Sequence, residues 1–258
     1  MVIADKADNL ILECRGVTKN FGALAAVDNL DLSIGHGEVV GIGGPNGAGK
    51  TTFFDLLSGL SSVTAGEIRF LGREITKLAP HQICHLGMAR TFQLNSGFDQ
   101  MSVYENILAA RVFGPKSSGG WILTRDADRK AAHELLLELK LEDISNIKVA
   151  DIPVLARKKL MVATALINKP DILLLDEPVG GLTPKEIDEF IELINVVKFS
   201  GVTLIFIEHV MRFLTSVASR AVMMHQGKII YDGDPIEISS DKRVAEVYLG
   251  NNRQVLVR

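Results

Sequence analysis

A glycine-rich segment has the residue types and spacing of a phosphate-binding loop. Gly44, Gly49, Lys50 and Thr51 match the pattern G-x-x-x-x-G-K-[ST], between an apolar stretch, Val39–Ile42, and a segment expected to be helical. Glycines let successive backbone N–H groups face phosphates, and a helix start adds partial positive charge. Lysine suits the β- and γ-phosphates and threonine suits Mg²⁺, which favours nucleotide binding over an ordinary glycine-rich turn. The residues predicted to hold the nucleotide are Pro45, Asn46, Gly47, Ala48, Gly49, Lys50, Thr51 and Thr52.

Two neighbouring carboxylates follow a continuously apolar segment, Ile172–Leu175. Such a run is typical of a parallel strand buried on both faces, so Asp176 and Glu177 are expected at the carboxyl end of that strand. Asp176 could hold the Mg²⁺ shell, and Glu177 could polarise the water that attacks the γ-phosphate. Four aliphatic residues before an aspartate are a weak pattern alone, but the upstream phosphate loop makes these metal and water roles the favoured interpretation.

Two further polar residues are expected at strand ends. Gln93 closes the predicted strand Gly87–Gln93, where its amide oxygen could reach Mg²⁺ or the attacking water. His209 follows the predicted strand Val202–Ile207 and could donate to the γ-phosphate. An ordinary strand-end glutamine and a capping or surface histidine are the alternatives.

Phe21 is expected in a turn beside Gly22, between two short strands. The ring could stack on adenine, because an aromatic face accepts a purine with little geometric demand. It could equally be a hydrophobic plug under the turn, and the local residues do not separate the two interpretations.

Composition narrows the class of protein. The chain has 258 residues, 47% of them hydrophobic, which suffices for one large domain or a domain with a subdomain. The net charge of −3 gives no electrostatic reason to expect nucleic acid as a partner. Two cysteines, far apart, suit a reducing cytosol, and no apolar run of about 18 residues suggests a membrane span. We therefore expect a soluble chain whose membrane role, if any, depends on a partner.

Strands alternate with helices along the chain, which predicts an α/β fold with a mainly parallel sheet. The remaining expected elements are strands Leu10–Val17 and Ala26–Ile34, a hairpin Gly66–Ile75, a helix from Pro80, helices Val103–Val112 and Arg129–Leu141, a hairpin of Ala221–His225 with Lys228–Tyr231, and a helix Pro235–Leu249.

The order of these motifs resembles the ATP-binding subunits of ABC transporters across essentially the whole chain. The runs GPNGAGKTT, LLLDEP and IEH are the specific matches. The runs GMARTFQ, MSVYENILAAR and VAEVYLG resemble the ATPase subunits of branched-chain amino-acid importers. The resemblance implies a single ABC ATPase domain over residues 1–258, with a RecA-like P-loop NTPase core, an N-terminal antiparallel β-subdomain and a helical subdomain at about 94–168.

The resemblance also implies function. ATP with Mg²⁺ would be hydrolysed to drive amino-acid uptake, through two membrane permease subunits fed by a periplasmic or extracellular substrate-binding protein, with the chain at the cytoplasmic face of the membrane. Phe21 would stack on adenine, Glu177 would be the catalytic base and His209 the switch histidine. Gln93 would serve both catalysis and the metal, together with Thr51 and Asp176.

One stretch departs from the family pattern. The LSGGQ signature should begin 24 positions before Asp176, but Ile152–Ala156 reads IPVLA there. In the family this motif contacts the γ-phosphate bound on a second ATPase subunit, and proline and bulky side chains remove those donors. Thr183 also stands where the family often has aspartate. We therefore expect a heterodimer with one competent and one degenerate site; a tolerant homodimer, an inactive chain and a nucleotide-binding regulator with weak or no hydrolysis are the alternatives.

Overall fold

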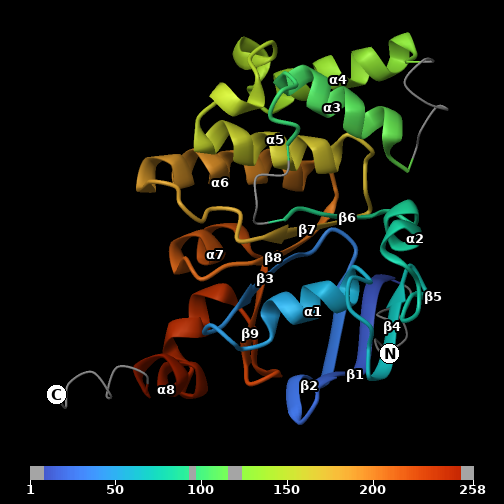
Figure 1. Cartoon of the computed structure of the whole chain (residues 1–258). Helices are drawn as coiled ribbons and strands as arrows, with labels where there is room; N and C mark the ends of the chain where they lie inside the picture. The colour runs from blue at the N-terminus through green and yellow to red at the C-terminus, as the bar shows by residue number, and fades with distance from the viewer. Residues whose placement is uncertain (1–8, 93–96, 116–123, 251–258) are drawn as a thin grey trace, which may run out of the picture. The chain divides into compact units, whose positions relative to one another are not determined.

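The computed structural model describes residues 9–92, 97–115 and 124–250, which form two compact units (Figure 1). The first unit combines the chain before residue 84 with the chain after residue 202, and the second contains residues 84–202. The short helix α2, Pro80–His85, begins at the proline as predicted and lies where the chain passes from the first unit to the second.

An antiparallel sheet forms the N-terminal part of the first unit. Its strand order is β2-β1-β4-β5, with bounds β1 Leu10–Phe21, β2 Leu24–Gly35, β4 Ala65–Phe70 and β5 Arg73–Glu74. The expected ends of the first two strands, at Val17 and Ala26, are wrong. Lys19 pairs with Val27 and Phe21 with Leu24, so both strands continue past those ends and only two residues connect them.

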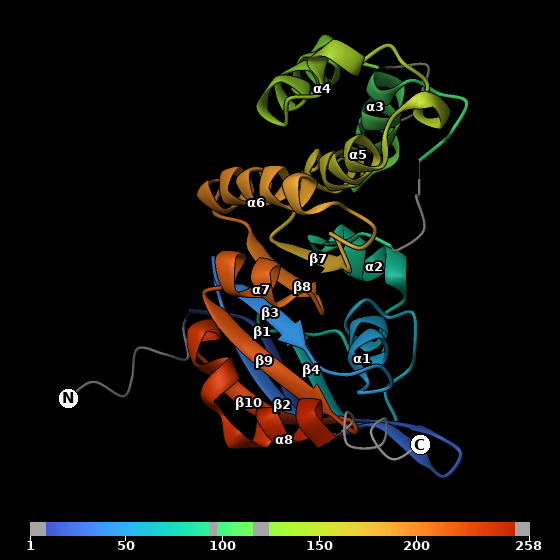
Figure 2. The same cartoon turned by 90° about the vertical axis from the view of Figure 1, so that its left-hand side faces the viewer.

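A mostly parallel set of strands forms the rest of the first unit, in the order β10-β9-β3-β8. Strand β3, Val39–Gly43, runs parallel to β8, Thr203–Ile207, and to β9, Arg220–His225, while β10, Lys228–Gly233, is antiparallel to β9. The helices are α1, Lys50–Leu57, α7, Met211–Val217, and α8, Lys242–Gly250 (Figure 2).

The expected C-terminal helix is interrupted. Pro235–Ser240 forms a 3-10 helix, η5, and α8 starts only after Asp241. The Asp241 carboxylate accepts hydrogen bonds from the backbone N–H groups of Arg243 and Val244, so it caps a new helix instead of continuing the old one. The guanidinium of Arg243 lowers the pKa of this carboxyl to about 2.

The second unit combines a parallel strand pair with a group of helices. Strands β6, Met88–Arg90, and β7, Ile172–Asp176, lie side by side. The helices are α3 Val103–Phe113, α4 Asp126–Glu138, α5 Val154–Leu166 and α6 Pro184–Phe199, with 3-10 turns η3 Glu142–Ile144 and η4 Val149–Asp151. Helix α3 packs on both α4 and α5 (Figure 2). Helices α3, α4 and α5 fall inside the range predicted for the helical subdomain, 94–168.

Two boundaries in the second unit differ from prediction. The strand expected over Gly87–Gln93 ends at Arg90, although the Thr91 N–H still donates to the Leu174 carbonyl. Helix α4 begins and ends three residues earlier than expected. The Asp128 carboxylate accepts the Arg125 N–H at 3.3 Å at the start of the helix. The predicted fold class, α/β with an antiparallel sheet and a mostly parallel sheet, is confirmed.

Thr183 has a structural role at the start of α6. Its hydroxyl accepts the Glu186 N–H, and the Glu186 carboxylate accepts the Thr183 N–H at 2.8 Å. We expect Thr183→Ala to lower the free energy of unfolding by about 1 kcal/mol and Thr183→Ser to preserve it, as measured by denaturant unfolding. An alanine variant as stable as wild type would contradict this role.

The capping box also predicts a pH dependence. The hydrogen bond from the Thr183 backbone lowers the pKa of Glu186 below its ordinary 4.5. The carboxylate therefore stabilises the fold fully above pH 4.5, and that contribution is lost as the pH falls through the lowered pKa. The stability difference between wild type and Glu186→Gln, measured by denaturant unfolding, should therefore shrink on acidification, because the variant lacks the titrating carboxylate.

Candidate nucleotide-binding and hydrolysis site

The glycine-rich loop joins β3 to α1, and its backbone requires glycine at two positions. Gly44 and Gly49 have φ of 141° and 100°, in the range that favours glycine. A Cβ at Gly44 would collide with the Met224 carbonyl oxygen, and one at Gly49 with the Ala26 carbonyl oxygen. The loop is thus held between β2 and β9, with its backbone free of side chains at the closest approaches.

Lys50 directs its charge into the loop. The residue is 8% exposed, and its Nζ donates to the carbonyl oxygens of Gly44 at 2.7 Å and Pro45 at 3.0 Å. Thr51, which is exposed, and Thr52 continue the first turn of α1. The ammonium group is therefore placed at the segment whose N–H groups are predicted to face phosphates.

Phe21 is the last residue of β1, and 54% of it is exposed. The Lys19 ammonium lies 4.9 Å from the ring centroid and also donates to the Ser62 carbonyl at 2.8 Å. This exposure contradicts the alternative of a buried plug under the turn. Stacking on adenine stays a prediction.

His209 follows β8 at the edge of the sheet from which the glycine-rich loop leaves β3. The two strands are parallel, with Ile42 opposite Ile207, so their carboxyl ends lie together. The fully buried Glu208 accepts the N–H groups of His209 at 2.9 Å and Val210 at 3.1 Å, which fixes the backbone there. The His209 side chain is 60% exposed.

Asp176 ends β7 in the second unit and is buried at 3% exposure. Its Oδ2 is 3.1 Å from Nη2 of Arg90, on the neighbouring strand β6, and both side chains are almost fully buried. The positively charged Arg90 guanidinium therefore lies beside the carboxylate that is predicted to bind Mg²⁺.

Glu177 directly follows β7 in a left-handed backbone conformation, with φ of 47°. Its carbonyl oxygen accepts the Gly180 N–H at 3.2 Å and Lys158 Nζ at 3.2 Å. Asp176 and Glu177 therefore occur together at the carboxyl end of one strand, as predicted. Gln93 lies outside the described residues.

The divergent stretch Ile152–Ala156 forms the start of a helix. Helix α5 begins at Val154, after Pro153, and no side chain caps it. Ile152 is buried, and Arg157 donates to the Ala150 carbonyl at 2.6 Å. The stretch thus has an ordered helix start with bulky side chains in place of a serine and glycines.

Residues 27–180 match the protein family described as "ABC transporter". The chain belongs to this family. It is an ATP-hydrolysing cassette, and it is 37% identical to the high-affinity branched-chain amino acid transport ATP-binding protein BraF of Pseudomonas aeruginosa over 250 residues, 93% of this chain and 98% of that protein. It is 36% identical to the corresponding LivG protein of Salmonella typhimurium over 256 residues, with the same coverage of each chain.

Comparison with solved structures also identifies the fold as that of an ABC cassette. The ADP conformation of an ATP-binding cassette of an ABC transporter aligns with a TM-score of 0.86 and 28% identity over 93% of this chain and 99% of that one. Among the residues described here, no helix has the length and apolarity needed to cross a membrane.

Arg90, Lys158 and Glu208 were not identified as site residues from the sequence. Each is a charged residue in an apolar or helical segment, which is a weak signal. Their contacts reveal their roles, but these contacts are with residues distant in the sequence or with backbone atoms.

Proposed function

We propose that this ABC cassette is the ATPase subunit of an importer of amino acids, with branched-chain amino acids as the first candidates. The observation that carries the proposal is the complete phosphate loop combined with Asp176 and Glu177 at a strand end. The printed names of BraF and LivG support the substrate class. A relative at 33% identity is the lipopolysaccharide export protein LptB of Acidithiobacillus ferridurans, so the cargo depends on the partners.

The hydrolysis step assigns one task to each group. A water oxygen bonds to the γ-phosphorus while the bond from phosphorus to the bridging oxygen breaks and ADP leaves, and Glu177 takes the proton of the water. Lys50 binds the phosphates, Phe21 stacks on adenine, and His209 and Gln93 orient the γ-phosphate and the water.

Mg²⁺ fits the oxygen donors that the chain provides. The Thr51 hydroxyl and the Asp176 carboxylate are hard oxygen ligands of the kind that Mg²⁺ prefers, and Gln93 would add an amide oxygen. The ion supplies positive charge to the phosphate oxygens when bound.

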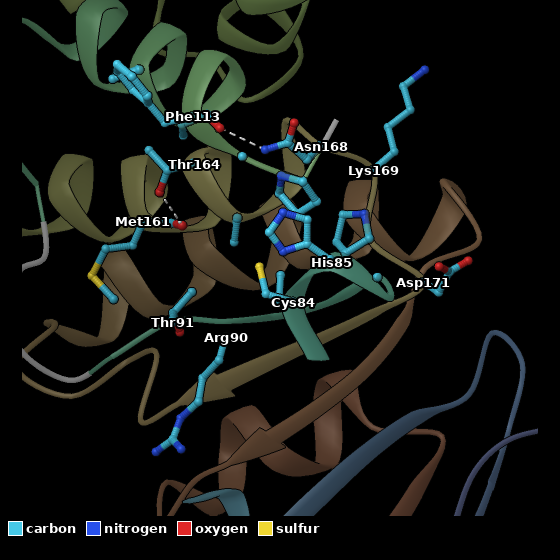
Figure 3. A pocket seen from close by; sticks show the side chains of 18 of the residues that line it. Cys84, His85, Arg90, Thr91, Phe113, Met161, Thr164, Asn168, Lys169 and Asp171 are labelled. Carbon is cyan, nitrogen blue, oxygen red and sulfur yellow. Dashed lines mark hydrogen bonds between the residues drawn. The ribbon is translucent and has the colours of Figure 1, made fainter. Parts of the chain in front are cut away.

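A hollow in the second unit supports a permease partner. It has a volume of about 550 Å³ and is lined mainly by apolar side chains of β6, α3 and α5. Figure 3 shows Phe113, Met161 and Thr164 around it, while Arg90 points away. Phe113 and Phe98 are 66% and 64% exposed at the lining, so an apolar permease segment would cover them and hold the chain at the cytoplasmic face of the membrane.

We expect Phe113→Ser to weaken copurification of the permease at least tenfold while ATP binding is unchanged, because it removes an apolar contact surface. Phe199→Ser is the matched control: this phenylalanine is 92% exposed and lies outside the hollow. Equal permease recovery with Phe113→Ser and Phe199→Ser would argue against docking at the hollow.

The second ATPase subunit is proposed to be a different chain. Ile152–Ala156 lacks the serine and glycines of the signature, so the site that this stretch completes on the partner should close poorly. The chain's own nucleotide should be hydrolysed when the partner brings an intact signature.

Transport assays test the function. Membrane vesicles that contain this chain, its permease and its partner, with the substrate-binding protein outside, should accumulate radiolabelled leucine only with ATP inside, and Lys50→Ala should abolish uptake. Normal uptake with Lys50→Ala would refute an energising role, and ATP binding without any hydrolysis in the assembled transporter would favour a regulator.

A further inference from the structure

Lys158 connects helix α5 to the turn that carries Glu177. It is the fifth residue of α5, and it is only 7% exposed. Its Nζ donates to the Glu177 carbonyl oxygen at 3.2 Å. A buried ammonium group requires hydrogen-bond acceptors. The backbone orientation that presents the Glu177 carbonyl to Lys158 is therefore favoured over one that turns the carbonyl away.

The turn at Glu177 needs support because its backbone is unusual. Residues other than glycine, asparagine and aspartate rarely adopt a φ of 47°. Such a backbone conformation persists where contacts with the surrounding structure hold it in place. Two donors meet the Glu177 carbonyl: the Gly180 N–H closes the turn locally, and Lys158 holds it from another element.

The orientation of this peptide group determines where the Glu177 carboxylate points. Rotation of the backbone at Glu177 would swing its Cα–Cβ bond, and an error of about 1 Å in a catalytic group can cost on the order of a hundredfold in rate. Lys158 opposes that rotation, because its charge would lose an acceptor.

The neighbouring lysine provides a contrast on the same helix. Lys159 faces α6, where its Nζ is 4.0 Å from the Glu189 carboxylate. It has the same charge and a mostly buried side chain, but it pairs with a carboxylate on the surface of α6 and not with the Glu177 turn.

We propose that Lys158 is a positioning residue for Glu177: it fixes the left-handed backbone that aims the carboxylate at the attacking water. This inference rests on the proposed role of Glu177 as the base. Since α5 begins within the divergent stretch, Lys158 also links that stretch to the catalytic turn.

Kinetics of the assembled transporter test the positioning role. Lys158→Met should lower kcat for ATP at least tenfold and leave KM within twofold, because it removes the donor and keeps the apolar stem. Lys158→Arg should recover most of kcat, and Lys159→Met should match wild type. A Lys158→Met enzyme with wild-type kcat would overturn the inference.

Amide hydrogen exchange of the purified full-length chain tests the contact without activity. Gly180 should exchange faster in Lys158→Met than in wild type or Lys159→Met, because the turn that it closes has lost its second donor. Unchanged Gly180 exchange overturns the inference whatever the kinetics. If Lys158→Met does not fold, Lys158→Gln, which is polar but too short to reach the carbonyl, gives the same two readings.

Glu177→Gln distinguishes failure of the proposed catalytic base from failure of the positioning role of Lys158. If it hydrolyses ATP at the wild-type rate, the proposed base is wrong and the positioning role falls with it. If it is inactive while Lys158→Met keeps a normal kcat, only the inference about Lys158 is wrong.

Discussion

Arg90→Met lowers the free energy of unfolding by about 3–5 kcal/mol, because it leaves a buried carboxylate without the guanidinium that neutralises it. The Arg90 and Asp176 side chains are 6% and 4% exposed, with 3.1 Å between Nη2 and Oδ2. Few water molecules can replace the lost partner at that depth.

An exposed pair on the antiparallel sheet gives the control. Nε of Arg69 is 2.6 Å from the Glu67 carboxylate, a shorter contact, but the side chains are 42% and 30% exposed. Arg69→Met should cost less than about 1 kcal/mol, because solvent screens such pairs. Denaturant unfolding of both variants measures the difference, and equal losses would show that burial does not govern the Arg90 contact.

Glu177→Gln lowers ATP turnover by a factor of about 10²–10⁴ and leaves ATP binding intact, because glutamine keeps the shape but accepts no proton. The measurement compares steady-state hydrolysis and fluorescent-nucleotide binding in the assembled transporter. Glu192→Gln, on the exposed face of α6, should behave as wild type. A Glu177→Gln enzyme within threefold of wild type would mean that another group takes the proton.

The sequence predicts the parts of the site whose chemistry is local. The phosphate loop is recognisable because its glycines, lysine and threonine act within eight residues, and β7 because four aliphatic residues in a row imply burial on both faces. The hairpin Gly66–Ile75 and the hairpin of Ala221–His225 with Lys228–Tyr231 are predicted in the same way, from the glycines Gly72 and Gly227 in their turns.

What the sequence could not predict depends on contacts between distant residues. Asp176 meets Arg90 across 86 positions, because β6 and β7 become neighbours only in the folded sheet. Lys158 reaches a carbonyl oxygen, which has no residue-type signal. The two strands of the hairpin that contains Phe21 are longer than the sequence predicts. Lys19 and Asn20 pair with β2 although the composition of their segment is typical of a turn.

Because Ile152–Ala156 lacks the serine and glycines of the signature, we expect hydrolysis by this chain to depend on a signature from another subunit. The most direct test is ATP turnover by the purified chain alone across a range of concentrations, with Lys50→Ala as the blank. We predict ATP binding with turnover near the blank at every concentration, and turnover that rises steeply with concentration once Ile152–Ala156 is replaced by LSGGQ. Turnover by the unaltered chain that rises steeply with concentration and vanishes in Lys50→Ala would show a working homodimer and contradict this prediction.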